Sequence, residues 1–141
     1  MQKNNLLKAA LVILYDAKKR FLLQHRSADA KVLPGYWAFF GGGIKKHETP
    51  KDAVCREALE ELNYILKDPV LFAEQRFELA GRNGHMYVYF EEFSGDKSNL
   101  KLNEGQGWGW YSLPQAQGLK MIGHDRSLLE RLAKFLNKGK R

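Results

Sequence analysis

Three glutamates within a few residues of one another have the chemistry and spacing of a metal site. Glu57, Glu60 and Glu61 lie in the segment 41–64, which reads GGGIKKHETPKDAVCREALEELNY. At about 100° per residue on a helix, their carboxylates fall on one face. Glutamates at i, i+4 repel each other by roughly 0.2–0.5 kcal/mol, and Arg56 is the only cation inside the cluster. Carboxylate oxygens suit Mg²⁺ or Mn²⁺, and phosphate can complete their coordination. The pattern therefore favours a metal and phosphate site over a merely solvated acidic face.

The same segment predicts the helix that carries these acids. Thr49 is a suitable N-cap, Pro50 suits the first helical position, and Asp52 completes a capping-box pattern. Asn63 tolerates the left-handed conformation that commonly ends a helix. The predicted helix is about 13 residues long. Its face opposite the acids is apolar and is expected to pack on a core: Val54, Cys55, Ala58, Leu59 and Leu62.

These residues resemble the Nudix box, Gly-x5-Glu-x7-Arg-Glu-U-x-Glu-Glu-x-Gly-U, in which U is a bulky apolar residue. Every charged position of the pattern is present. The matching residues are Gly42, Glu48, Arg56, Glu57, Glu60 and Glu61. Asn63 stands in place of the usual glycine, whereas Lys45 and His47 stand where many relatives carry glutamate and glycine. The chain is similar to Nudix hydrolases, and in particular to their MutT-like branch.

The resemblance implies an α+β protein with the Nudix fold, an α/β/α sandwich around a mixed β-sheet with a loop–helix–loop Nudix box. It also implies roles for individual residues. Arg56 would pair with Glu48 and orient the acidic face, and Glu57 or Glu104 would act as general base. The metal site would use Glu57, Glu60, Glu61, Glu104 and Gly42.

A second group of residues is expected near the substrate. Glu-Gly-Gln at 104–106, followed shortly by Trp108, resembles the MutT-type segment that supplies a further carboxylate, although an ordinary loop acid is the alternative. Trp108 is a candidate base contact. Residues 123–125 fall where MutT-like proteins place polar side chains against the base, so His124 or Asp125 would read a base edge, unless Asp125 caps the next helix. Lys45 would lie beside the phosphates or simply on the surface.

Composition and charge set the broader expectations. The 141 residues fit one domain, 1–141, with an adequate core. The net charge of +7 favours an anionic partner, and we expect a nucleotide rather than nucleic acid. The apolar stretch 6–15 is far shorter than the ~20 residues that span a bilayer. We therefore read it as a buried strand and expect no membrane partner. With one cysteine and no export signal, a cytoplasmic location is expected, while the sequence leaves a homodimer open.

The remaining pattern predicts short elements around the helix. Strands are expected at 8–15 and 20–25 as a hairpin-like pair and at 36–40 before the glycine run. A second hairpin, 70–79 with 85–93, would turn at Asn83-Gly84. Helices are expected at 113–119, with Ser112 as its cap, and at 125–136. Trp110 is expected in the core.

The reaction implied by the resemblance is Mg²⁺-dependent hydrolysis of a nucleoside triphosphate, including 8-oxo-dGTP, to the monophosphate and pyrophosphate. ADP-ribose, nucleotide sugars and dinucleotide polyphosphates are alternative substrates. A Nudix-fold binding module without turnover is the alternative from a different class, and it would normally have lost charged positions of the motif.

Overall fold

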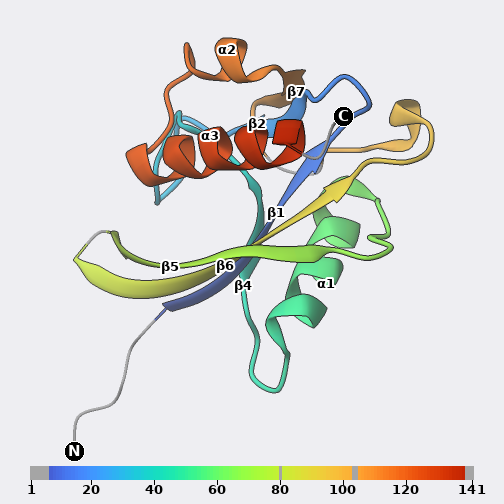
Figure 1. Ribbon diagram of the computed structural model, residues 1–141. Coiled ribbons are helices and arrows are strands. Elements are labelled where there is room, and N and C mark those ends of the chain that lie inside the picture. The colour runs from blue at the N-terminus through green and yellow to red at the C-terminus, as the bar shows by residue number, and fades with distance from the viewer. Residues whose placement is uncertain (1–6, 80, 103–104, 139–141) are drawn as a thin grey trace, which may run out of the picture.

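The computed structural model describes residues 7–79, 81–102 and 105–138. Seven strands of these residues form one sheet, and helices lie on both of its faces (Figure 1). The strands are β1 (Leu7–Tyr15), β2 (Phe21–His25), β3 (Trp37–Ala38), β4 (Phe40–Gly43), β5 (Val70–Leu79), β6 (Arg82–Glu92) and β7 (Gly107–Tyr111). The helices are α1 (Pro50–Leu62), α2 (Leu113–Ala116), α3 (Gly123–Lys138) and the 3-10 helix η1 (Lys97–Asn99).

Strand β1 is the centre of the sheet. The strand order is β3-β2-β1-β6-β5, with β4 also paired to β1 and β7 to β2. β1 runs parallel to β6 and antiparallel to β2 and β4, so the sheet is mixed. Its side chains alternate between the two faces. Ala10, Val12 and Leu14 belong to a core cluster on the α1 face, whereas Ile13 belongs to the cluster on the other face.

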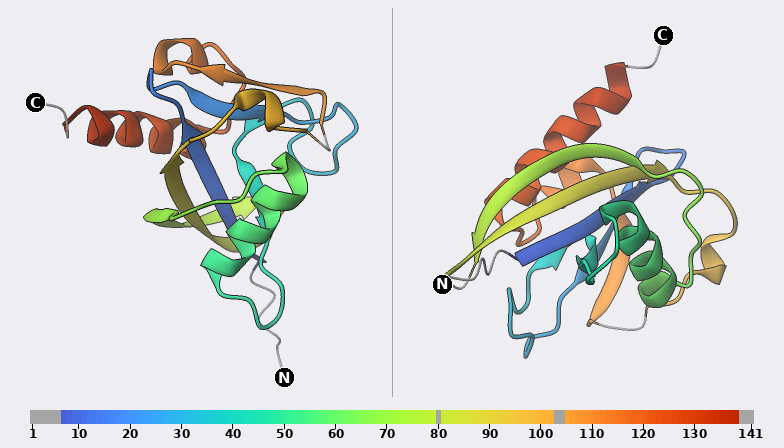
Figure 2. Two further views of the ribbon diagram at one scale, coloured as in Figure 1. Left: turned by 90° about the vertical axis from the view of Figure 1, so that its right-hand side faces the viewer. Right: turned by 90° about the horizontal axis from the view of Figure 1, so that it is seen from below.

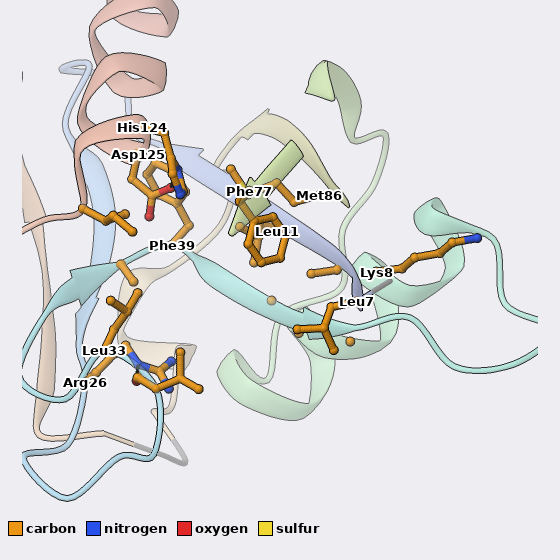
Figure 3. Close-up of a pocket in the computed structure, with 17 residues that line it drawn as sticks. Leu7, Lys8, Leu11, Arg26, Leu33, Phe39, Phe77, Met86, His124 and Asp125 are labelled. Atoms are coloured by element: carbon orange, nitrogen blue, oxygen red, sulfur yellow. Dashed lines mark hydrogen bonds and ion pairs between the residues drawn. The ribbon is translucent and has the colours of Figure 1, made fainter. Parts of the chain in front are cut away.

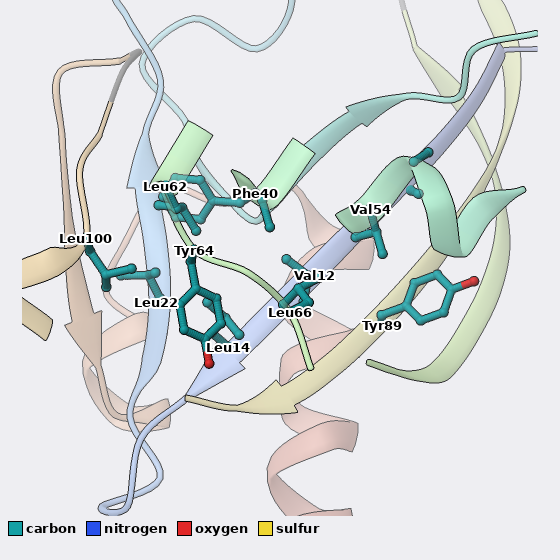
Figure 4. Close-up of a cluster of buried hydrophobic side chains, with 13 residues drawn as sticks. Val12, Leu14, Leu22, Phe40, Val54, Leu62, Tyr64, Leu66, Tyr89 and Leu100 are labelled. Carbon is teal, nitrogen blue, oxygen red and sulfur yellow. The ribbon is translucent and has the colours of Figure 1, made fainter. Parts of the chain in front are cut away.

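Each face of the sheet is covered by helices. α1 packs on one face through Ala53, Val54, Ala58 and Leu62, all of which are buried. Leu59, which was expected on this face, is instead 49% exposed. The side chains beneath it form the cluster shown in Figure 4. α2 and α3 cover the other face, and Figure 2 shows α1 and α3 on opposite sides of the sheet. The predicted α+β class and the α/β/α sandwich are confirmed.

The prediction of a second hairpin is correct for its two strands but wrong for the position of its turn. β5 and β6 pair down to Leu79 opposite Arg82, so Asn83 and Gly84 lie within β6. Gly84 lies opposite Phe77, and a Cβ added at residue 84 would be 2.1 Å from the Phe77 ring. The glycine thus makes room for an aromatic ring across the ladder. The tight turn instead contains Gly81, whose φ is +75°.

Other elements differ from expectation mainly at their ends. The predicted strand 36–40 is divided between β3 and β4. The predicted helix 113–119 ends at Ala116 but has the expected Ser112 cap, whose hydroxyl accepts from the Gln115 N–H. α3 begins at Gly123, so Asp125 is its third residue and not its N-cap. Trp110 packs against the cluster on the α1 face, as expected of a core residue.

Candidate active site

The ends of α1 are set by local contacts that the sequence predicts. The Thr49 hydroxyl accepts a hydrogen bond from the Asp52 N–H at 3.0 Å, and the Asp52 carboxylate accepts from the Thr49 N–H at 3.5 Å. At the other end Asn63 is left-handed, with φ 57° and ψ 38°, and its N–H donates to the Leu59 carbonyl. α1 spans 13 residues. These caps fix the register of the helix, and hence which residues of α1 face the glycine-rich strand β4.

The glycines of β4 allow α1 to approach the strand closely. A Cβ on Gly42 would lie 2.6 Å from the Glu57 Oε2 atom. The Gly41 N–H donates to Glu61 Oε1 at 3.0 Å, and Gly41 itself has φ +143°. A side chain at Gly42 would therefore displace the Glu57 carboxylate. β4 thus places Glu57 and Glu61 directly against bare backbone.

Arg56 joins the acidic residues of the box. Its guanidinium donates to both carboxylate oxygens of Glu48, from Nε at 2.6 Å and from Nη2 at 3.0 Å. Nη1 donates to Glu57 at 3.0 Å and to Glu60 at 3.2 Å, while Nη2 also reaches the Gly43 carbonyl at 3.0 Å. The hydrogen bond from Arg56 lowers the pKa of Glu48 from 4.5 to about 2. The same contacts raise the pKa of Arg56, so both groups of the pair are charged at neutral pH.

The oxygen donors of α1 fit a hard divalent cation by their chemistry. In the part of the chain that the structure describes, no three His, Cys, Asp or Glu side chains are grouped as a metal site. The carboxylates instead contact Arg56 and the Gly41 N–H. Glu60 is 56% exposed and Glu57 15%. A metal would therefore compete with Arg56 for these oxygens. Glu104 lies outside the described residues.

A pocket of about 390 Å³ opens on the α3 face of the sheet, beside the same glycines (Figure 3). Its walls are mostly apolar and come from β1, β4, the β5–β6 hairpin and the loop after β2. Gly41, Gly42 and Gly43 line the pocket. β4 therefore contacts the pocket as well as the carboxylates of α1. The remaining lining residues are Leu7, Lys8, Ala9, Leu11, Arg26, Val32, Leu33, Ala38, Phe39, Phe77, Met86, Ile122, His124 and Asp125.

Two of the four charged or polar side chains that line this pocket lie at the start of α3, and the other two are Lys8 and Arg26. His124 and Asp125 line the pocket, and their Nδ1 and Oδ1 atoms lie 3.0 Å apart. Asp125 is only 5% exposed. Both atoms are buried, and neither has a hydrogen-bond partner of acceptable geometry among the described residues. The pair therefore places a carboxylate, which is a hydrogen-bond acceptor, and an imidazole in the wall of the pocket.

The other predicted substrate residues lie elsewhere. Trp108, on β7, packs against the core cluster of the α1 face and does not line the pocket. Lys45 is exposed, and its N–H donates to Glu48 Oε1 at 2.8 Å. The sequence did not single out Arg26, Phe39 or Phe77. No local pattern marks them, because each becomes a pocket residue only when separate strands and loops are brought together.

Comparison with known proteins agrees with the fold and with the box. The NUDIX domain family matches residues 5–132. A CTP pyrophosphohydrolase of Escherichia coli is 30% identical over 122 residues, which cover 86% of each chain. An 8-oxo-dGTP diphosphatase of Escherichia coli is 31% identical over 110 residues, which cover 76% of this chain and 81% of that protein. The crystal structure of a MutT protein from Methanosarcina mazei has a TM-score of 0.81 at 25% identity and covers 98% of this chain and 99% of its own.

The chain therefore belongs to the Nudix family, and within it to the MutT-like hydrolases, which act on phosphorus-containing anhydrides. The solution structure of the Escherichia coli ORF135 protein is also similar, with a TM-score of 0.74 at 26% identity over 96% of this chain and 93% of that one. None of the described helices is both long and apolar enough to cross a membrane.

Proposed function

We propose that this protein hydrolyses a nucleoside triphosphate to the monophosphate and pyrophosphate in a reaction that depends on Mg²⁺. The arrangement of the acidic face and the apolar pocket around one strand carries the proposal. The acidic face of α1 lies against β4, and the pocket is lined by the same three glycines. A nucleotide could thus place its base in the pocket and its phosphates along β4 toward the carboxylates.

The first task of the acidic residues would be to bind the metal ion. Glu57, Glu60 and Glu61 would hold the metal ion, with Gly42 beside it and with Glu104 as a further ligand. When bound, the metal neutralises phosphate charge and lowers the pKa of a water molecule. Mn²⁺ has similar ligand preferences and could substitute.

The remaining residues of the box would act on protons and on orientation. Glu57 or Glu104 would accept a proton from the attacking water as general base. Arg56 and Glu48 would hold the acidic face in position through their paired contacts. Lys45, whose backbone N–H contacts Glu48, would add positive charge near the phosphates.

The pocket would bind the base by apolar contact and read it through the pair of His124 and Asp125. A carboxylate is a hydrogen-bond acceptor, and the cytosine amino group is a donor that Asp and Glu accept. We therefore expect Asp125, supported by His124, to prefer a base that presents an amino group. The similarity to a CTP pyrophosphohydrolase supports cytosine as one such base. Trp108 would contribute only indirectly, because it packs against the core cluster of the α1 face and does not line the pocket.

The test is incubation of the purified protein with Mg²⁺ and separate samples of dCTP, dATP, dGTP, dTTP, 8-oxo-dGTP, ADP-ribose and a nucleotide sugar. Chromatography should detect monophosphate and pyrophosphate from at least one triphosphate, and no product when EDTA replaces Mg²⁺. Cleavage of only ADP-ribose or the sugar nucleotide would retain the enzyme class but contradict the proposed substrate. Absence of any product would instead favour a binding module.

A further inference from the structure

A second surface, on the C-terminal half of α3, combines aromatic rings with positive charge. A hollow of about 580 Å³ there is lined by Phe72 of β5 and by Arg131, Lys134, Phe135 and Lys138 of α3. We call these five residues the α3 patch. Arg131, Lys134 and Lys138 are spaced at three, four and seven residues, so they share one side of the helix. Figure 2 shows this half of α3 extending away from α1.

The aromatic rings of the α3 patch pack on one another, and one of them is also exposed to solvent. Phe135 is 53% exposed, yet its ring lies 5.8 Å from that of Phe72 and 5.7 Å from that of Phe90. The Arg131 guanidinium lies over the Phe72 ring, 5.6 Å from its centroid. The rings are thus held in place by the core of the α3 face, and Phe135 remains available for a flat ligand.

The cations of the α3 patch are not engaged in ion pairs with the described acidic side chains. Among residues 7–79, 81–102 and 105–138, no acidic side chain forms an ion pair with Arg131, Lys134 or Lys138. Glu130, the nearest acid in sequence, accepts a hydrogen bond from Gln117 at 3.2 Å. The three cations extend over about 10 Å along the helix, at a rise of about 1.5 Å per residue. They therefore present a line of positive charge beside an exposed ring.

We propose that the α3 patch binds single-stranded nucleic acid, with phosphates on the three cations and a base against Phe135. Proteins that bind single strands combine a cationic groove with aromatic rings on which bases stack. A lipid surface fits less well, because the patch is hollowed and Phe135 is the only large, strongly exposed apolar side chain that lines it. The proposal does not depend on the proposed hydrolysis, since Phe135 lies ten residues, or about 15 Å by the same helical rise, along α3 from Asp125.

The probe is a fluorescein-labelled 20-nucleotide oligo(U), with oligo(dT) in parallel, titrated in EDTA by fluorescence anisotropy at several salt concentrations. Three phosphate contacts predict that log K falls with log salt with a slope of about −2 for a single strand. The double variant Arg131→Gln/Lys134→Gln should weaken binding about tenfold at low salt and reduce the slope by about 1.4. A matched double variant on the α1 side, Lys51→Gln/Lys101→Gln, removes the same charge and should leave both values unchanged.

The aromatic contribution is tested with Phe135→Ala, which should weaken binding at least about fivefold while the salt slope stays the same. Because Phe135 also packs on Phe72 and Phe90, its result is interpreted together with that of the double glutamine variant, whose side chains are exposed. Equal affinity for a 20-base-pair duplex, tighter binding to vesicles rich in phosphatidylserine, or an equal effect of the two double variants would each overturn the proposal. Nucleotide hydrolysis should be unchanged in the patch variants.

Discussion

At the scale of single residues, Arg56 decides how the acidic face is arranged. One guanidinium contacts Glu48, Glu57 and Glu60 as well as the Gly43 carbonyl. It thereby offsets the repulsion among glutamates on one side of α1. A metal ion would take over part of that role, because it also neutralises carboxylate charge.

Replacing Glu57 with Gln should remove most of the activity without unfolding the protein. Loss of a metal ligand or of a general base reduces turnover by about 10²–10⁴-fold, whereas the amide can still accept a hydrogen bond from Arg56. Steady-state hydrolysis and a thermal melt would measure both effects. Glu78→Gln, at an exposed position on β5, is the matched control and should retain activity. A Glu57→Gln enzyme with normal turnover would remove Glu57 from the proposed site.

The pairing of Glu48 with Arg56 should make stability depend on pH in acid. The pKa of Glu48 is about 2 in the folded protein and 4.5 as its ordinary value. The stabilisation by this pair is therefore complete above about pH 4.5 and is lost as pH falls toward 2. Urea unfolding at pH 6, 4 and 3 should show a smaller loss of stability in Glu48→Gln than in the wild type.

The stability of the Glu48→Gln variant will still fall in acid, because the pKa of a second carboxyl group is also lowered in the folded protein. Burial raises the pKa of Asp16, but hydrogen bonds from Lys97 and Arg20 outweigh it and lower the pKa from 3.8 to about 2. An identical pH profile in the wild type and in Glu48→Gln would show that the Arg56 pair does not stabilise the fold.

At the scale of elements, two neighbouring glycines of β4 are required by different contacts, one with α1 and one with β1. At Gly42 an added Cβ meets the end of the flexible Glu57 side chain. At Gly41 it would lie 2.2 Å from the Ala10 carbonyl oxygen of β1, and φ is +143°. Gly42 therefore leaves room for a carboxylate of the proposed site, whereas Gly41 allows β4 to pack against the backbone of β1.

Two alanine variants should separate these roles. Gly42→Ala should fold with nearly normal stability but lose activity at least about tenfold, because Glu57 is displaced. Gly41→Ala should lower stability by more than about 2 kcal/mol, because backbone atoms cannot move aside as a side chain does. Thermal melts and hydrolysis rates of the two variants provide the comparison, in which each serves as the control for the other. Equal loss of stability in both would contradict this division.

The elements also show which parts of the structure a sequence can predict. Both ends of α1 were predicted correctly, because the capping contacts of Thr49, Asp52 and Asn63 reach only a few residues along the chain. The prediction of a turn at Asn83-Gly84 was wrong, because Gly84 makes room for the ring of Phe77 on the neighbouring strand. That contact joins two strands and is not visible in the local sequence. The pocket was only partly foreseen, through His124 and Asp125, because its other walls are distant in sequence.

At the scale of the whole molecule, the two functions of the proposed site lie on different faces of the sheet. Base recognition would belong to the start of α3 and catalysis to α1, with β4 between them. Selectivity and turnover should therefore respond to different substitutions. Such a separation is visible only in the assembled fold.

Asp125→Asn should change base preference more than turnover. If the carboxylate accepts from an amino group, the ratio of kcat/KM for dCTP to that for dTTP should fall by about 5- to 150-fold, which corresponds to ~1–3 kcal/mol of discrimination. The kcat for the best substrate should change much less. Glu130→Gln, also on α3, should leave the ratio unaltered. An unchanged ratio in Asp125→Asn would remove this carboxylate from base recognition.

The central position of β1 has a consequence for how the protein opens. Its backbone joins β6 on one side and β2 and β4 on the other, and it supplies side chains to both cores. Amide hydrogens of residues 10–14 should exchange with solvent only through global unfolding, whereas those of the edge strand β5 should exchange by local fraying. Hydrogen–deuterium exchange with mass spectrometry would measure the difference. Since β4 is paired with β1 by backbone hydrogen bonds, the glycine-lined site should persist for as long as the whole molecule stays folded.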